Sequence, residues 1–307
     1  MPHTETWMDG DRLDRPALDR LMAAATAVDG HHPLSDHLRM DLARGAGSGF
    51  AAVTARTSDQ LVGYAQLSEV NGLHTVEVVV EPTARADLSI AGDLLHAAID
   101  VVATRGGGAV QWWSFDADRR PQGGADDAGL AAKAGLALTR SLYQMRCELP
   151  TGLTVDVPTR SFEPGADEAA WLRVNNRAFA THPEQGGWTM ETLALREAEP
   201  WFDADGFRLH ERDGRLAAFC WTKLHTDTSP VLGEIYVIAV DPDFQGLGLG
   251  RQLTLAGLAS IADRGVAVGM LYVDADNTAA VTMYEHIGFT IHRTDRAYTA
   301  DIEAAPA

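Results

Sequence analysis

The chain repeats one order of sequence patterns, and this repeat limits its possible folds more than any other feature. Residues 61–82 (LVGYAQLSEVNGLHTVEVVVEP) predict two strands joined by a polar loop, and residues 215–242 (RLAAFCWTKLHTDTSPVLGEIYVIAVDP) predict the same pair. Each pair ends in an acidic residue and a proline. A helical segment, an apolar strand, a second helix and a glycine before apolar residues then follow in both halves. Two copies of one mixed α/β unit are therefore predicted.

A proline-containing segment separates the two copies. Residues 148–167 (ELPTGLTVDVPTRSFEPGAD) show little helical periodicity, and a chain of 307 residues suits two domains of average size. We expect an N-terminal domain at 1–150 and a C-terminal domain at 158–307. In the second copy the patterns predict helices at 170–179, 189–199, 250–265 and 277–288, and strands at 207–210, 215–223, 233–240 and 268–274.

Composition places the chain among soluble proteins. Hydrophobic residues make up 46% and charged residues 22%, and no apolar stretch approaches the length of a membrane span. The polar start, MPHTETWMDGDRLDR, has no signal-peptide core. The two cysteines, Cys147 and Cys220, lie in apolar, strand-like segments and predict buried thiols in a reducing compartment, not a disulfide or a metal site. We expect a cytoplasmic protein with no metal and no membrane partner.

The charge balance excludes one large class of function. The formal net charge is −18, whereas a nucleic-acid-binding protein needs a basic face to meet phosphates. An anionic ligand must therefore be bound by local donors, because long-range attraction by this chain is unfavourable.

Residues 240–254 (VDPDFQGLGLGRQLT) place a glycine-rich turn between a predicted strand and a predicted helix. The Walker pattern fails because Arg251 follows Gly250 where lysine is required, and the dinucleotide pattern fails on its glycine spacing. Gln245, Gly248 and Gly250 fit a third pattern, Gln/Arg-x-x-Gly-x-Gly/Ala. The unpaired N–H groups and the positive dipole end of a helix start bind a pyrophosphate. A glycine-rich turn without a ligand is the alternative.

At these residues the sequence resembles the GCN5-related N-acetyltransferase (GNAT) superfamily, whose acyl-CoA pyrophosphate loop has this pattern. Residues 272–289 (YVDADNTAAVTMYEHIGF) resemble the closing motif of that superfamily: a strand, Asn277, a helix with Tyr284, then Gly288 and an aromatic residue. Asn277 and Tyr284 lie two helical turns apart, on one face. Ordinary core packing is the alternative for the tyrosine.

Three further segments, RVNNRAFATHPEQGGWT, WTKLH and GEIYVIAVDP, resemble the mycothiol-forming branch of the superfamily, whose members have two tandem domains. The resemblance implies an enzyme that transfers acetyl from acetyl-CoA, bound as a co-substrate, to the cysteine amine of cysteinyl-glucosaminyl-inositol. Its partner is then a small pseudo-disaccharide thiol, with no nucleic acid and no membrane, and we expect a monomer.

Glu234 and Tyr284 are the catalytic residues that the resemblance implies. Glu234 starts a predicted alternating strand with Tyr236, Ile238 and Val240 on the same side, and a buried carboxylate is unfavourable unless it is paired or functional. The resemblance makes it the general base, with an edge-strand glutamate as the alternative. Tyr284 is then the general acid, since a phenol is protonated at neutral pH.

The resemblance also implies the binding residues. The donor is held at the pantetheine by Ile238, Ala239 and Val240, at the pyrophosphate by Gln245, Gly246, Leu247, Gly248, Leu249, Gly250 and Arg251, and on its other side by Asn277, Thr278, Ala279, Ala280, Val281 and Thr282. The acceptor is held by Asp36, Glu184, Lys223, Glu234 and Tyr272. From the residues alone, a solvated surface position is favoured over a ligand role for Asp36, Glu184, Lys223 and Tyr272, and Ser35 or Asp36 could simply cap a helix.

The first half departs from this pattern. Leu88 and Ile90 occupy the glycine positions, and alignment of the repeats puts His74 opposite Glu234 and Ala131 opposite Tyr284. We therefore expect this half to be catalytically silent. Val78, Val79 and Val80 remain candidates for a second pantetheine site, as the resemblance suggests.

Two other functions stay open on the sequence. One is an acetyltransferase for another amine, such as an aminoglycoside or a protein N-terminus. The other is a non-catalytic acyl-CoA-binding protein, against which the intact glycine loop, Glu234 and Tyr284 argue together.

Overall fold

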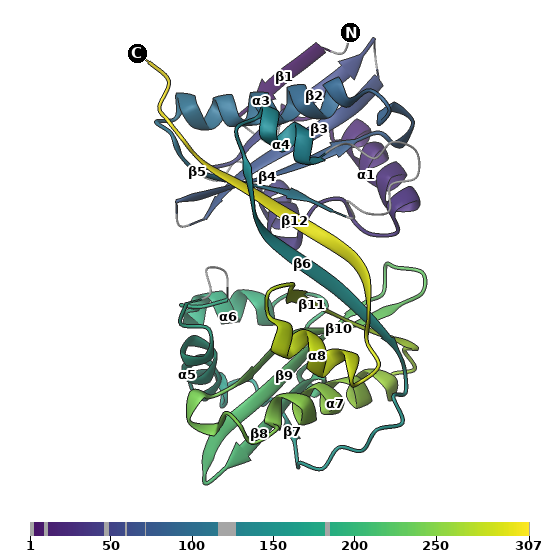
Figure 1. Cartoon of the computed structure of the whole chain (residues 1–307), viewed down its shortest axis with the longest axis vertical. Helices are drawn as coiled ribbons and strands as arrows, with labels where there is room; N and C mark the ends of the chain where they lie inside the picture. Colours follow the sequence, from purple (N-terminus) through teal and green to yellow (C-terminus); the bar gives the residue numbers. More distant parts are fainter. Residues whose placement is uncertain are drawn as a thin grey trace. The chain divides into compact units, whose positions relative to one another are not determined.

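The computed structural model describes residues 3–8, 12–45, 49–58, 60–70, 72–115, 127–181 and 185–306. The chain forms two compact units: Met1–Leu142 together with Arg293–Ala307, and Tyr143–His292. Both contain a sheet with helices packed on its faces, so the predicted mixed α/β class is confirmed (Figure 1).

The first unit has the strand order β1-β2-β3-β4-β5-β12. Its elements are β1 (His3–Trp7), α1 (Arg15–Asp29), α2 (Asp36–Arg44), β2 (Ala51–Thr57), β3 (Gln60–Val70), β4 (Leu73–Val80), the 3-10 turn η2 (Pro82–Ala84), α3 (Leu88–Thr104), β5 (Gly108–Ser114) and α4 (Asp127–Lys133). Strand β4 runs antiparallel to β3 and parallel to β5. This order gives the unit one sheet with a helix cluster on each face.

The last strand, β12 (Thr290–Ile302), completes the sheet of the first unit. Its residues from Arg296 to Ile302 pair antiparallel with Ser114 to Gly108 of β5. The sequence placed all of 158–307 in the second domain, so the two divisions differ at the end of the chain. The reason is that local periodicity identifies a strand but not the strand with which it pairs.

Apolar clusters lie on both faces of the first sheet. Val76 and Val80 of β4 pack with α3, whereas Val79 packs with α1 and α2. Gly63 of β3 permits close contact with α3, because a Cβ there would lie 2.7 Å from Leu94 Cδ1. Each valine of β4 therefore has a packing role in the protein core.

The second unit has the strand order β6-β11-β10-β9-β8-β7. Its elements are β6 (Ala137–Glu148), which begins in the first unit, β7 (Arg160–Ser161), α5 (Glu168–Ala178), α6 (Met190–Glu197), η3 (Ala204–Gly206), β8 (Phe207–Arg212), β9 (Arg215–His225), β10 (Leu232–Val240), η4 (Pro242–Phe244), α7 (Leu249–Ala262), β11 (Val268–Asp274) and α8 (Thr278–Glu285). The helices and strands predicted for this half are confirmed, with small shifts at their ends.

Two clusters cover the faces of the second sheet. Helices α7 and α8 contribute to one cluster, with Leu253 and Leu271 inside it, and α5 and α6 contribute to the other (Figure 1). The second cluster is aromatic: the buried ring of Trp171 contacts Phe207 and Trp221 edge-on. Cys147 and Cys220 are buried free thiols, as predicted, and burial raises the pKa of Cys147 to about 12.

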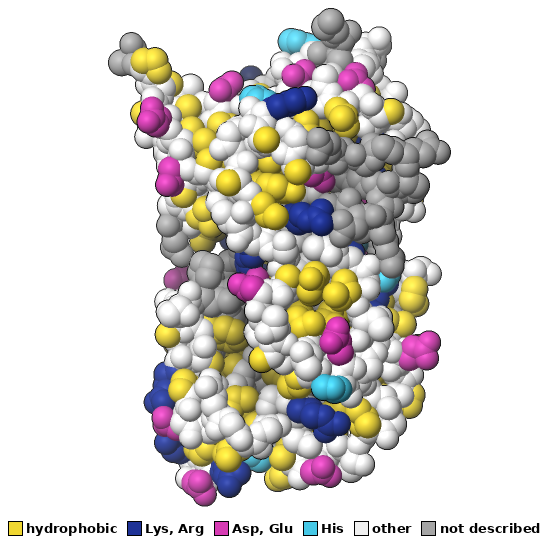
Figure 2. All heavy atoms as spheres, viewed as in Figure 1, with side chains coloured by type: hydrophobic (Ala, Val, Ile, Leu, Met, Phe, Trp, Pro, Cys, Tyr) yellow, Lys and Arg dark blue, Asp and Glu magenta, His cyan; other side chains and the backbone are white. Residues whose placement is uncertain are grey.

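No helix among the described residues is long and apolar enough to span a membrane. The face in Figure 2 carries acidic and basic side chains interspersed.

Candidate active site

Strands β10 and β11 separate part of the way along the second sheet. The two strands pair in parallel from Leu232 and Val268 to Ile235 and Leu271. Both strands continue beyond this point but no longer pair with each other. On its other side β10 remains paired with β9 as far as Val240. From Val237 to Val240, β10 therefore has no ladder to β11, which leaves that edge open to an added extended ligand.

A β-bulge in β10 changes which residues share a face. The register with β9 shifts between Ile235 and Val237. As a result Ile238 and Val240 pack in the α7 and α8 cluster, on the face opposite Tyr236. The sequence analysis expected Ile238 and Val240 on the same side of the strand as Glu234, and this expectation is wrong. A bulge adds one residue and so reverses the alternation of side chains beyond it.

Glu234 lies just before the bulge and is buried, with 7% of its surface exposed. Its Oε2 is 2.7 Å from Nε2 of His225, the last residue of β9, so an N–H of the ring donates to the carboxylate. The sequence analysis missed His225. A single histidine after a strand carries no pattern, and only the strand register brings it to the glutamate.

Lys223 is paired with Glu234 across β9 and β10, so the two side chains share a face of the sheet. It is also buried, at 6% exposed. Its ammonium lies 4.8 Å from the centre of the Trp201 ring and 5.7 Å from that of Tyr236. These cation–π contacts hold a positive charge beside the candidate base.

Tyr272 belongs to the same face, two residues beyond Met270, which pairs with Glu234. Its side chain is partly exposed, and its hydroxyl accepts a hydrogen bond of 2.8 Å from the buried Gln144 of β6. The structure thus brings Lys223, Glu234 and Tyr272 onto one face from three adjacent strands. Gln144 was not recognised in the sequence, since its partner comes from a distant segment.

Tyr284 lies in α8 and belongs to the cluster on the opposite face of the sheet. It is 7% exposed, and its ring packs edge-on against Phe289 at 5.7 Å. Burial raises the pKa of the Tyr284 phenol, so the hydroxyl keeps its proton throughout the neutral range. Glu234 and Tyr284 thus belong to opposite faces of a sheet whose β10 and β11 have separated.

The glycine-rich turn forms an exposed approach to α7. Gly248 precedes the helix in the left-handed region at φ 73°, and no side chain caps the first turn. The residues from Gln245 to Gly248 are exposed. Gly250 lies inside the first turn, where a Cβ would meet only Met283 Sδ of α8, at 3.9 Å. Uncapped N–H groups with open space in front of them suit a bound pyrophosphate.

Asn277 caps α8, because its Oδ1 accepts a hydrogen bond of 3.2 Å from the N–H of Ala280. This contact gives it a structural role in the free protein. Thr278, Ala279 and Thr282 are exposed on the helix that Asn277 caps, and Ala280 and Val281 are half-buried. The first turn of α8 is thus accessible from solvent.

The remaining predicted residues lie elsewhere. Asp36 begins α2 of the first unit, where Ser35 is the N-cap residue, and its Oδ1 is 3.9 Å from Arg39 Nη1. Glu184 lies outside the described residues. Val78 and Val80 pack toward α3 and Val79 toward α1.

The start of α3 differs chemically from the start of α7. Asp87 caps α3 by accepting from the N–H of Ser89 at 3.1 Å, so a carboxylate already occupies the place of an anion. The alignment of the repeats also needs correction. Thr75 of β4 pairs with Ser68 of β3 in the way that Glu234 of β10 pairs with Lys223 of β9, so the residue that corresponds to Glu234 is Thr75 and not His74. The difference of one residue arises because β10 has a bulge and β4 has none.

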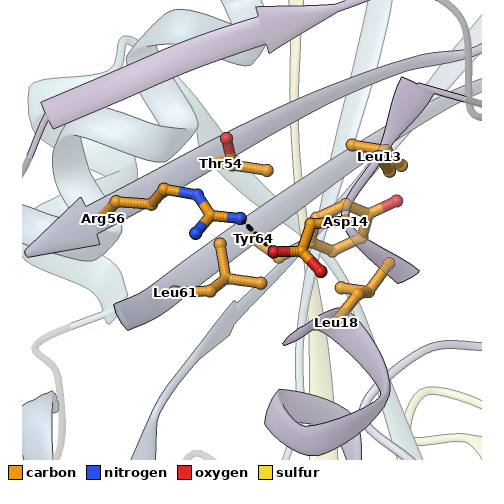
Figure 3. Close-up of a pocket in the computed structure, with 7 residues that line it drawn as sticks. All are labelled: Leu13, Asp14, Leu18, Thr54, Arg56, Leu61 and Tyr64. Carbon is orange, nitrogen blue, oxygen red and sulfur yellow. Dashed lines mark hydrogen bonds and ion pairs between the residues drawn. The ribbon is translucent and has the colours of Figure 1, made fainter. Parts of the chain in front are cut away.

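A small pocket in the first unit contains none of the predicted site residues (Figure 3). It is lined by Leu13, Asp14, Leu18, Thr54, Arg56, Leu61 and Tyr64. Arg56 donates to Asp14 across it at 2.9 Å, and this hydrogen bond lowers the pKa of Asp14. The pocket is therefore a gap beside an ion pair.

Comparison with known proteins agrees with this arrangement. Residues 171–289 match the model of the Acetyltransferase (GNAT) family. A GCN5-related N-acetyltransferase from Sphaerobacter thermophilus has the same fold, with a TM-score of 0.73 and 21% identity over 99% of this chain and 97% of that one. A tandem GNAT protein from the clavulanic acid biosynthesis pathway covers 100% of both chains, with a TM-score of 0.69 and 17% identity. Fold and site thus define an acetyltransferase of the GNAT class with two tandem units.

Full-length relatives give the narrower assignment. A mycothiol acetyltransferase of Thermobispora bispora is 43% identical over 293 residues, which is 93% of this chain and 95% of the relative. Another, from Geodermatophilus obscurus, is 44% identical over 303 residues, 94% of this chain and 95% of the relative. The chain belongs to the mycothiol acetyltransferase family, which confirms the resemblance found in the sequence.

Proposed function

We propose that this chain transfers the acetyl group of acetyl-CoA to the cysteine amine of cysteinyl-glucosaminyl-inositol and so completes mycothiol. Similarity to mycothiol acetyltransferases over 93% of the chain carries the proposal. The polar face around Glu234, beside the separated strands β10 and β11, supports it as a place where an amine and a thioester meet.

Acetyl-CoA fits the residues that lie beyond the separation point. Main-chain groups of Ile238, Ala239 and Val240 pair with the pantetheine, and one N–H among them polarises the thioester carbonyl. The segment from Gln245 to Arg251 holds the pyrophosphate at the uncapped start of α7. The first turn of α8, from Asn277 to Thr282, lines the other side of the donor.

The neutral amine attacks the thioester carbon, so a C–N bond forms, the nitrogen becomes positively charged and the carbonyl oxygen takes up negative charge. Glu234 accepts a proton from that nitrogen, directly or through a water. Collapse of this intermediate breaks the C–S bond, and Tyr284 donates its proton to the departing sulfur. One proton has moved to Glu234 and one has left Tyr284, and exchange with solvent restores both groups.

A base and an acid on opposite faces of the sheet suit this reaction. An acyl group that enters between β10 and β11 has Glu234 on one side and Tyr284 on the other. The amine then approaches from one face and the sulfur is protonated from the other, so the two proton transfers do not interfere.

Lys223 and Tyr272 offer the polyol acceptor hydrogen-bond partners beside Glu234, as a polar ligand requires. We assign Asp36 and Glu184 to the same acceptor on the strength of the family relationship. The first unit is catalytically silent in this proposal. Thr75 stands where a base is needed, and the cap by Asp87 disfavours a pyrophosphate. Val78, Val79 and Val80 remain candidates for binding a pantetheine there.

The proposed enzyme works in the cytoplasm, where buried free thiols such as Cys147 and Cys220 persist. We propose that it is a monomer without a metal requirement. Gel filtration with light scattering tests the first point, and assays after dialysis against a chelator test the second.

The function is tested by offering the purified protein acetyl-CoA with cysteinyl-glucosaminyl-inositol, an aminoglycoside or a peptide with a free N-terminus. Product is followed by mass spectrometry, because the acceptor thiol interferes with thiol reagents. We expect turnover with the first acceptor. Turnover with the other amines alone would refute the proposed acceptor, and tight coenzyme binding without turnover would indicate a non-catalytic binding protein.

A further inference from the structure

The imidazole of His225 makes a close contact with the proposed base. Its Nε2 lies 2.7 Å from Oε2 of Glu234, and the two side chains are 22% and 10% exposed. His225 is two residues beyond Lys223 on β9 and therefore lies on the same face as the base. The contact thus joins a half-buried histidine to a carboxylate on the polar face of the site.

The backbone of His225 is also fixed. Its carbonyl accepts a hydrogen bond of 2.9 Å from the hydroxyl of Thr228, which also donates to the carbonyl of Pro230 at 2.9 Å. His225 itself pairs with Leu232 at the start of β10. The main chain that carries the ring is therefore held by a strand pair and by the turn that joins β9 to β10.

The contact distinguishes the two oxygens of the carboxylate. Oε2 of Glu234 accepts from His225, whereas Oε1 has no hydrogen-bond partner among the residues that the structure describes. A carboxylate fixed through one oxygen presents the other in one direction. A general base must meet its proton at hydrogen-bond distance, so this orientation bears directly on the transfer.

We propose that His225 is a positioning residue, which holds Glu234 through Oε2 so that Oε1 faces the amine of the acceptor. The inference rests on the proposed function of Glu234 as the base. His225 makes no contact with the donor in this proposal, so its loss acts on the transfer from the amine and not on acetyl-CoA binding.

Substitution by leucine and by glutamine separates the hydrogen bond from packing. His225→Leu keeps an apolar side chain of similar size but removes the donor. His225→Gln restores an N–H at the position of Nε2, because the same number of bonds separates both nitrogens from Cβ. His225→Asn places its amide one bond closer to the backbone, out of reach of Oε2. His210→Leu is the matched control, since it removes a buried histidine whose ring bonds the Pro158 carbonyl at 2.8 Å and no other group among the described residues.

We expect His225→Leu and His225→Asn to lower kcat/KM for the acceptor by about 10- to 100-fold, the size of effect expected when a hydrogen bond to a charged group is lost. The dissociation constant for acetyl-CoA stays unchanged, and His225→Gln stays within about threefold of wild type. His210→Leu lowers the melting temperature but leaves kcat/KM within about twofold. In a Glu234→Gln background, His225→Leu has no further effect, because the group that it orients no longer accepts a proton.

Each other outcome has a distinct meaning. Equal losses in the glutamine and leucine variants, or wild-type activity in His225→Leu, overturn the positioning role. If the leucine variant does not fold, the glutamine and asparagine variants decide by the same criterion. A wild-type protein that acetylates none of the offered amines refutes the proposed function itself, before any variant is compared.

Discussion

Replacement of Tyr284 by phenylalanine tests the proposed acid with little disturbance of the fold. The ring belongs to a buried cluster and packs edge-on against Phe289 at 5.7 Å, contacts that phenylalanine preserves. The Tyr284 hydroxyl has no hydrogen-bond partner among the described residues, so its removal breaks no hydrogen bond to any of them. The substitution therefore removes a proton donor and almost nothing else.

The expected effects on stability and on rate differ greatly. Loss of a hydroxyl that makes no internal hydrogen bond changes the free energy of unfolding by less than about 1 kcal/mol. Loss of a general acid lowers kcat by about 100-fold or more, which corresponds to about 2.7 kcal/mol in the barrier. Because burial raises the pKa of this phenol, wild-type activity does not fall through ionisation of Tyr284 anywhere in the neutral range.

The assay is steady-state kinetics with both substrates varied, together with thermal unfolding of both proteins. A kcat within twofold of wild type would refute the role of Tyr284 as acid. A similar loss in a variant whose melting temperature has fallen by many degrees would instead show that the ring packing was needed, and the reasoning from its contacts would be wrong.

Three further predictions concern the donor, the acceptor and stability. Gly250→Ala raises the free energy of unfolding by up to about 1 kcal/mol, because the position is helical and a Cβ there meets only Met283 Sδ at 3.9 Å. The pattern Gln/Arg-x-x-Gly-x-Gly/Ala admits alanine at this position, so calorimetry should show acetyl-CoA binding within about twofold of wild type; a loss of about tenfold or more would show that the pyrophosphate lies too close to residue 250 for a side chain. Lys223→Met keeps packing against Trp201 but removes the charge, so KM for the acceptor rises about tenfold while KM for acetyl-CoA does not; an unchanged acceptor KM would remove Lys223 from the acceptor site. Burial raises the pKa of Glu77 from 4.5 to about 7, so the folded protein binds a proton that the unfolded chain has lost, and stability falls as pH rises between these values, by up to about 3 kcal/mol. Glu77→Gln should flatten that part of the melting-temperature profile, and an unchanged slope would contradict this origin.

Local sequence patterns were sufficient for most elements of the second unit. The strand expected at 268–274 has the bounds Val268–Asp274, and the helix expected at 170–179 is Glu168–Ala178. The strand is a short apolar run that ends at Asp274, and the helix has buried apolar residues at helical spacing, so the local signal agrees with the tertiary fold.

The sequence could not show features that depend on pairing between strands. The bulge in β10 adds one residue without interrupting the run of apolar residues. The order of the residues therefore does not show that side chains beyond Val237 point to the opposite face of the sheet. The contact of His225 with Glu234 and that of Gln144 with Tyr272 likewise arise from strand register. The sequence motifs thus predicted the chemistry, whereas the hydrogen-bond partners of Glu234 and Tyr272 could be identified only from the folded structure.

The pairing of β12 with β5 has a consequence for biosynthesis. Ala305 also donates from its main-chain N–H to the carbonyl of Ala103 in α3, at 2.9 Å. A ribosome releases residues in order, so β5 stays without its partner β12 until everything up to residue 302 has been translated. The half that emerges first is therefore the last to be finished, and its unpaired edge needs protection from other nascent chains in the meantime.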